Sequence, residues 1–229
     1  MKYSIIISVT LSAALFLLAG LTFGKTSPGE NLQVDIDEKK LRSGELQVFN
    51  LDESVDVSGV GKRKRILGVM LFNASAEDVW SILKQWERTP EFVPAVNYYK
   101  ILKVKKPVRK DAVGKSLIEG SMRVAFMNII YTLNVEFYED RMRHEWRMLS
   151  DDEIKEYREQ GVPVQDNSST LRIVEGFGFV KPYGDGSQSV YYYSPVVETG
   201  VPVPGYIERS LTERSLNDYM GGLKKLVEE

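Results

Sequence analysis

The sequence predicts an α+β fold in which a curved antiparallel sheet wraps around one long C-terminal helix. Three features lead to this prediction. A first strand is followed by two short helices, a run of strands comes next, and one long amphipathic segment ends the chain. With 229 residues, 43% hydrophobic and 27% charged, the chain has the composition of a globular protein that can bury a full core.

The first 24 residues have the pattern of a targeting segment. Lys2 supplies a positive start, residues 5–23 are almost all apolar, and Thr22 and Gly24 are the small residues that a signal peptidase reads. We predict a cleaved signal peptide, with an uncleaved membrane anchor as the alternative, since the apolar run is about long enough to span a bilayer. Either reading places the domain outside the cytoplasm. The absence of cysteine from an exported chain favours a bacterial periplasm.

Residues 25–61 are predicted to be a linker and N-terminal extension. Residues 25–42 are polar and weakly ordered by composition, residues 44–52 could form a short strand, and residues 58–61 form a turn. The folded domain is then expected over residues 62–229, and its first strand over residues 62–73.

Two helices are predicted next. Ser75 is an N-cap with Asp78 three residues later, and an apolar stripe follows at helical spacing: Val79, Trp80, Ile82, Leu83 and Trp86. Pro90 and Pro94 prevent that helix from continuing, but Pro90 suits the first turn of a new one. A brief second helix is therefore expected from Pro90 to about Phe92.

The remaining elements follow in order. Strands are predicted at residues 98–105, 115–126, 128–138, 141–148, 170–180 and 190–197, with a polar helix at 151–160 inserted between two of them and a hairpin turn at 184–186. Pro204 opens the final helix, whose apolar positions are Ile207, Leu211, Leu216, Tyr219, Leu223 and Leu226. Glycines that could let the sheet bend are Gly114, Gly120, Gly176 and Gly178.

Several kinds of chemistry are excluded or disfavoured. The chain has no cysteine and a single histidine, so thiol catalysis and Cys- or His-rich metal sites are not expected. A net charge of −2 argues against nucleic-acid binding by bulk electrostatics. We find no Ser-His-Asp arrangement and no phosphate-binding loop, and the Gly176-Phe177-Gly178 stretch lacks the third glycine of a dinucleotide loop. No cofactor, no metal and no catalytic residue is therefore predicted.

Three stretches carry a family resemblance: NASAEDVWSILKQWERTPEFVPAV, GFGFVKPYGDGSQSVYYYSPVVE and VPVPGYIERSLTERSLNDYMGGLKKLVEE. Together with the element order, they resemble the helix-grip (SRPBCC) superfamily of START, Bet v 1 and polyketide-cyclase-like domains, most closely its coenzyme Q-binding (Coq10-like) branch. The resemblance covers about residues 65–229. The export segment, the tail before Lys62 and the insertion at residues 151–167 depart from it.

The resemblance implies a ligand cavity between the sheet and the C-terminal helix, with the short second helix at its lip. Phe92 and Val93, held between Pro90 and Pro94, would then lie at the cavity mouth. The alternative is a rigid corner whose aromatic ring caps the core.

His144 is the most informative candidate, because it alternates onto the apolar strand face with Trp146. In a cavity protein it is a polar ligand contact, whereas in an ordinary core it is one hydrogen-bonded histidine. If its strand pairs with the next one near Leu149 and Thr170, His144 lies opposite Glu175 and the two form a polar pair. The predicted ligand-binding residues are His144, Trp146, Tyr131, Glu175, Phe177, Phe92 and Met122.

The leading hypothesis is an exported binding or carrier protein for a hydrophobic small molecule, such as a lipid, quinone or polyketide-like compound. One alternative is a cyclase- or dehydratase-type enzyme that uses His144 and Glu175 in the same cavity. Another is a membrane-tethered interaction module with a filled core. The basic run at residues 62–65 is interpreted as a solvated strand end, and the alternative is a binding site for anionic lipid headgroups.

Overall fold

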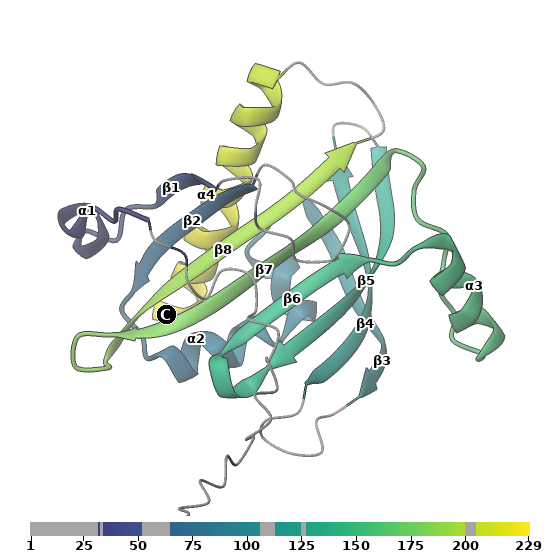
Figure 1. Ribbon diagram of the computed structural model, residues 1–229, viewed down its shortest axis with the longest axis horizontal. Coiled ribbons are helices and arrows are strands. Elements are labelled where there is room, and N and C mark those ends of the chain that lie inside the picture. Colours follow the sequence, from purple (N-terminus) through teal and green to yellow (C-terminus); the bar gives the residue numbers. More distant parts are fainter. Residues whose placement is uncertain (1–31, 33, 52–64, 106–112, 125–126, 200–204) are drawn as a thin grey trace, which may run out of the picture.

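One antiparallel sheet of eight strands forms the body of the molecule. The computed structural model describes residues 32, 34–51, 65–105, 113–124, 127–199 and 205–229. The strand order is β1-β2-β8-β7-β6-β5-β4-β3, and the long helix α4 packs against one face of the sheet (Figure 1). The predicted α+β class, with a sheet gripping a C-terminal helix, is confirmed.

The strands are β1 (Gln47–Leu51), β2 (Arg65–Phe72), β3 (Val96–Lys105), β4 (Gly114–Val124), β5 (Met127–Tyr138), β6 (Arg143–Met148), β7 (Leu171–Tyr183) and β8 (Gln188–Thr199). The α-helices are α1 (Glu38–Arg42), α2 (Ala76–Leu83), α3 (Asp151–Glu159) and α4 (Gly205–Glu228). The 3₁₀ helices are η1 (Trp86–Glu91) and η2 (Glu139–Arg141). The predicted strands and the inserted helix are thus all present, with ends shifted by a few residues.

We call the sheet face that packs on α2 and α4 the inner face. Alternation along β5 sends its odd-numbered residues to this face, as predicted. Met220 and Leu223 of α4 lie in the same buried cluster as these β5 side chains. The β5 residues in the cluster are Ile129, Tyr131, Leu133, Val135 and Phe137.

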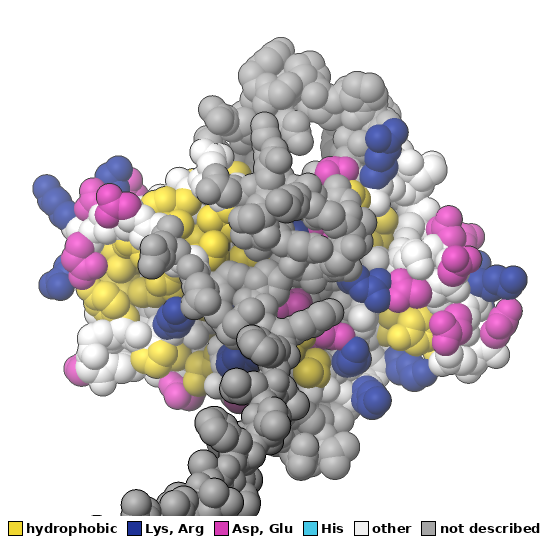
Figure 2. Space-filling view, in the orientation of Figure 1, with side chains coloured by type: hydrophobic (Ala, Val, Ile, Leu, Met, Phe, Trp, Pro, Cys, Tyr) yellow, Lys and Arg dark blue, Asp and Glu magenta, His cyan; other side chains and the backbone are white. Residues whose placement is uncertain are grey.

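The opposite, outer face carries two smaller cores. One core lies beside α1 and β1 and contains Leu67, Phe177 and Phe179, and the other lies beneath α3 around Ile154. Figure 2 shows hydrophobic side chains gathered over the end of the sheet near β1 and β2, whereas charged side chains dominate on the side of α3.

The segment before β2 contains a helix that was not predicted, α1, and the possible strand at residues 44–52 is present as β1. Asp37 caps α1 by accepting hydrogen bonds from the backbone N–H groups of Lys39 and Lys40, at 2.9 and 3.1 Å. β1 pairs with β2, so the sheet begins before residue 62. The stretch predicted to be weakly ordered therefore ends in a helix. The predicted signal segment, Lys62 and Pro204 lie outside the described residues.

The region after β2 differs from prediction in its second helix. Ser75 caps α2 as expected, since its Oγ accepts from the N–H of Asp78 at 3.1 Å. The second helix, however, begins at Trp86, and Pro90 lies near its end rather than at its start. The turn closes before the proline, where the N–H of Arg88 donates to the carbonyl of Gln85 at 2.9 Å, so Pro90 need not donate. Trp86 thereby leaves the α2 stripe and belongs to η1.

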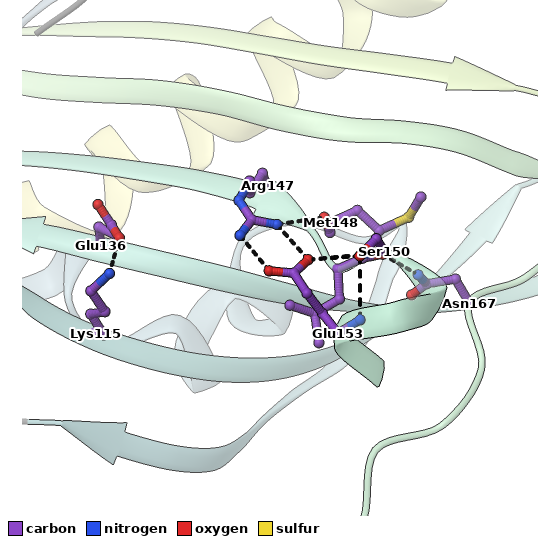
Figure 3. A network of polar contacts seen from close by, with 8 residues as sticks. Lys115, Glu136, Arg147, Met148, Ser150, Glu153 and Asn167 are labelled. Carbon is purple, nitrogen blue, oxygen red and sulfur yellow. Dashed lines mark hydrogen bonds and ion pairs between the residues drawn. The ribbon is translucent and has the colours of Figure 1, made fainter. Parts of the chain in front are cut away.

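The inserted helix α3 is fixed to the sheet by an ion pair. Arg147 of β6 donates to both carboxylate oxygens of Glu153, at 2.7 and 2.5 Å (Figure 3). Ser150 and Glu153 form the reciprocal capping box at the start of α3. Among the described helices, none is both long and apolar enough to cross a membrane.

Candidate functional site

The inner face carries an aromatic cluster centred on His144. The chain has three tryptophans, and all three lie around this imidazole. Ring centroids of Trp80 and Trp86 lie 6.0 Å from that of His144, and the Trp146 centroid lies 5.2 Å away. The large rings around His144 thus come from three different elements: α2, η1 and β6. Of the three tryptophans, only Trp86 is half-buried.

His144 is held as a neutral imidazole. Its Nε2 lies 3.0 Å from the hydroxyl of Tyr191 on β8. Burial, and secondarily the charge of Arg143, lowers the pKa of His144 to about 3. At neutral pH the ring is therefore an uncharged hydrogen-bonding group inside an aromatic cluster.

Phenol groups continue the layer on both sides of His144. The hydroxyls of Tyr99 and Tyr131 are 2.9 Å apart, and Tyr193 stacks on Tyr219 of α4 with centroids 4.4 Å apart. Desolvation raises the pKa of each of these four tyrosines. Tyr99, Tyr193 and Tyr219 nevertheless keep accessible surface. These three tyrosines are therefore half-buried residues of the inner layer.

Two glycines of β7 make room for this cluster. A Cβ at Gly176 would lie 2.2 Å from Cζ2 of Trp146, and one at Gly178 would lie 2.4 Å from Nε2 of His144. Both glycines therefore face inward, between the inward side chains Val174 and Val180. Pairing of β7 continues through them, and its one irregularity lies between Leu171 and Ile173. We conclude that these glycines serve the packing of the rings, whereas sequence reasoning assigned them to bends.

The predicted pairing of His144 with Glu175 is wrong. In the observed register His144 lies opposite Gly178, and Glu175 lies opposite Arg147. The strands pair three residues away from the predicted register, and an odd shift moves a side chain to the other face. Glu175 is therefore on the outer face, where it forms a buried ion pair with Arg65.

Phe177 also belongs to the outer face, two residues after Glu175. It lies in the outer core beside Leu67, and the guanidinium of Arg143 sits 4.7 Å from its ring centroid. The seven predicted residues thus divide into two groups. His144, Trp146, Tyr131, Met122 and Phe92 pack in or against the inner core, whereas Glu175 and Phe177 lie behind the sheet.

Phe92 rests on α4. Its ring lies 5.6 Å from that of Tyr219, centroid to centroid. A Cβ at Gly222 would lie only 2.4 Å from the carbonyl oxygen of Phe92, so the glycine is what allows this close approach. The loop after η1 is therefore in direct contact with the C-terminal helix. Met122, on β4, is half-buried at the edge of the same core.

The predicted set of ligand-binding residues omitted several members of the cluster: Trp80, Trp86, Tyr99, Tyr191, Tyr193 and Tyr219. Trp80 and Trp86 were recognised only as a helical stripe. For Tyr191 and Tyr193, alternation was the available signal, because Tyr192 between them points to the outer core. In the described part of the chain, no group of three or more His, Asp or Glu residues is arranged to hold a metal ion.

Comparison with solved structures agrees with this architecture. A STAR-related lipid transfer protein from Xanthomonas axonopodis superposes with a TM-score of 0.57 at 12% identity, over 86% of this chain and 97% of its own. The chain has the START/Bet v 1-like helix-grip fold. The Zhui aromatase/cyclase from Streptomyces sp. R1128 superposes with a TM-score of 0.55 at 11% identity, over 72% of this chain and 93% of its own.

A START superfamily protein from Mycobacterium smegmatis gives a TM-score of 0.54 at 17% identity, over 72% of this chain and 97% of its own. No protein-family model and no curated protein sequence matches the chain. Helix-grip neighbours therefore include both a lipid transfer protein and a cyclase. At these identities the likeness establishes the fold alone.

Proposed function

We propose that the protein binds a hydrophobic small molecule between the inner face of the sheet and α4. The observation that carries this proposal is the aromatic layer around His144, whose rings include half-buried members at Trp86, Tyr99, Tyr193 and Tyr219. Apolar walls with a few convergent polar groups are typical of small-molecule sites. The presence of a lipid transfer protein among the structural neighbours supports the same function.

Binding without chemistry fits the electrostatics of the cluster better than acid–base catalysis does. A general base works best with a pKa near the ambient pH, but the pKa of His144 is lowered to about 3. Burial raises the pKa of Tyr191, its partner, well above the ordinary value, so that phenol is a weak acid. Glu175, the second member of the predicted catalytic pair, lies on the other face of the sheet.

The setting of this function is also a proposal. The apolar N-terminal segment supports export, either as a cleaved signal peptide or as an anchor, and hence a periplasmic carrier of a lipid, quinone or polyketide-like compound. The same proposal includes membership of the coenzyme Q-binding branch and contact with a membrane surface. N-terminal sequencing of the mature protein tests the export step: a start near residue 25 supports cleavage, and an intact Met1 refutes it.

Gentle purification from the native host tests the binding function. The protein is extracted with organic solvent, and co-purifying compounds are identified by mass spectrometry and quantified against the protein. We expect one hydrophobic compound at near-stoichiometric amount. An empty protein that also fails to take up N-phenyl-1-naphthylamine would contradict the proposal and favour an interaction module with a filled core.

A further inference from the structure

Two buried nitrogens in the aromatic cluster lack hydrogen-bond partners within the described part of the chain. Among the residues that the structure describes, neither Nδ1 of His144 nor Nε1 of Trp86 has a partner. His144 is only 1% exposed. Leaving a buried polar atom unpaired costs about 1–3 kcal/mol, and most such atoms in proteins are paired. Two of them on neighbouring rings therefore indicate a group that both could bind.

The two nitrogens belong to rings that come from different elements and meet in an edge-to-face arrangement. The centroids of Trp86 and His144 are 6.0 Å apart, and Trp86 also contacts Trp146 and Tyr99, at 5.9 and 5.2 Å. Both nitrogens are enclosed by the cluster, so a ligand reaches them by displacing a ring. Trp86 is the half-buried tryptophan and lies on the short helix η1, so its ring is the one that a ligand can displace.

We infer that Trp86 Nε1 and His144 Nδ1 together bind a hydroxyl group of an uncharged, ring-containing ligand. The indole N–H is only a donor, so it requires an acceptor. The neutral imidazole uses Nε2 for Tyr191 and presents Nδ1 as one further donor or acceptor. A hydroxyl oxygen accepts from the indole, and the same hydroxyl can donate to or accept from Nδ1. The inference rests on the proposed binding function and specifies its ligand class.

The surroundings of the two nitrogens favour an uncharged ligand. The rings that contact His144 are Trp80, Trp86, Trp146 and Tyr191, none of which carries a charge. Arg143 lies on the opposite face of the sheet, where it binds Glu145 at 2.7 Å. A carboxylate placed beside His144 would lose its hydration, and none of these four rings offers a positive charge in return. Aromatic walls also favour flat rings, which stack on them.

Competition binding to the purified protein tests this inference. N-phenyl-1-naphthylamine is the fluorescent reporter, and the competitors share one skeleton: 2-naphthol, naphthalene and 2-naphthoate. We expect 2-naphthol to bind about tenfold more tightly than either of the others, the size of one or two net hydrogen bonds. Equal affinity for 2-naphthol and naphthalene would overturn the inference while leaving hydrophobic binding intact.

Trp86→Phe and Trp80→Phe form a matched pair of variants. Both remove one indole N–H from the cluster, but that of Trp80 already donates to Glu139 at 2.7 Å. Trp86→Phe should reduce the preference for 2-naphthol over naphthalene to less than about threefold, whereas Trp80→Phe should keep it. The ratio of two affinities cancels general effects of either change on the cluster.

The outcomes separate the two proposals. A preference that survives Trp86→Phe, or falls equally in both variants, overturns the role of the Trp86 indole. His144→Phe is a second check, since it removes Nδ1 and should weaken the preference as Trp86→Phe does. If the reporter itself does not bind, the proposed function fails, and the inference fails with it.

Discussion

His144 is the single histidine of the chain, so its protonation can be followed through stability without a second imidazole interfering. Its pKa is lowered from 6.5 to about 3 in the folded protein. The unfolded chain therefore binds a proton first, and the stability that the neutral ring contributes is complete above about pH 6.5 and lost as the pH falls toward 3. Between pH 7 and pH 5 we expect a loss of about 2 kcal/mol in urea unfolding.

The control for this prediction is His144→Phe, which removes the titrating group but keeps a ring. Its stability should be nearly flat between pH 7 and pH 5, even if it is lower throughout. A wild-type curve as flat as that of the variant would show that the imidazole is solvated, and would contradict the enclosed cluster.

Glu175 provides the opposite case, a buried carboxylate outside the site. It is 3% exposed and paired with Arg65 on the outer face. Glu175→Gln removes the carboxylate charge that faces the buried Arg65 guanidinium and should lower the free energy of unfolding by about 3 kcal/mol. Affinity for N-phenyl-1-naphthylamine should stay within about twofold, because the change lies behind the sheet. If Glu175→Gln abolished binding without changing stability, Glu175 would belong to the ligand site after all.

At the scale of elements, the adjacent glycines of α4 form a natural comparison. A Cβ at Gly221 meets no atom within 4 Å, whereas one at Gly222 meets the Phe92 carbonyl oxygen at 2.4 Å. Gly221→Ala should raise stability by about 0.5–1 kcal/mol through helix propensity. Gly222→Ala should lower it by about 1–3 kcal/mol, since the loop must move away. Chemical denaturation measures both, and a stabilising Gly222→Ala would show that Phe92 does not rest on the helix.

The α3 insertion should depend on the Arg147–Glu153 pair. Hydrogen bonding to Arg147, and to Ser150, lowers the pKa of Glu153 to about 2. The pair is about one-third exposed, so we expect Glu153→Gln to cost only about 1 kcal/mol at pH 7. The difference should shrink as the pH falls from about 4.5 toward 2, where the carboxylate gains its proton. A difference independent of pH would point to packing instead of charge.

The sequence was sufficient to predict those elements in which apolar and polar residues alternate. Alternation placed the β5 side chains and His144 and Trp146 on the inner face, and capping placed α2. Alternation did not identify the inner face of β7, because residues 174–180 are all buried and thus show no alternation of buried and exposed positions. Glycine has no side chain to reveal its face, so the inward direction of Gly176 and Gly178 was hidden. The register of β6 on β7 depends on the α3 insertion between them, whose path local patterns do not specify.

For the whole molecule, the fold could be predicted further than the site. Element order predicted a sheet wrapped around the C-terminal helix, but the aromatic layer around His144 assembles rings from seven elements: α2, η1, β3, β5, β6, β8 and α4. Which rings meet depends on tertiary packing between segments far apart in sequence. Helix-grip neighbours that include a lipid transfer protein and a cyclase likewise leave the ligand to be read from the side chains.

A hydrophobic ligand is proposed to bind at the aromatic layer of the inner face. The most direct test is a titration with 2-naphthol, followed through the three tryptophan indole N–H signals in ¹⁵N–¹H correlation spectra and assigned with the Trp→Phe variants. We predict a saturable shift that is largest for Trp86 and small for Trp80, whose N–H is held by Glu139. Three indole signals that stay in place while the ligand is in excess would contradict ligand binding at this layer.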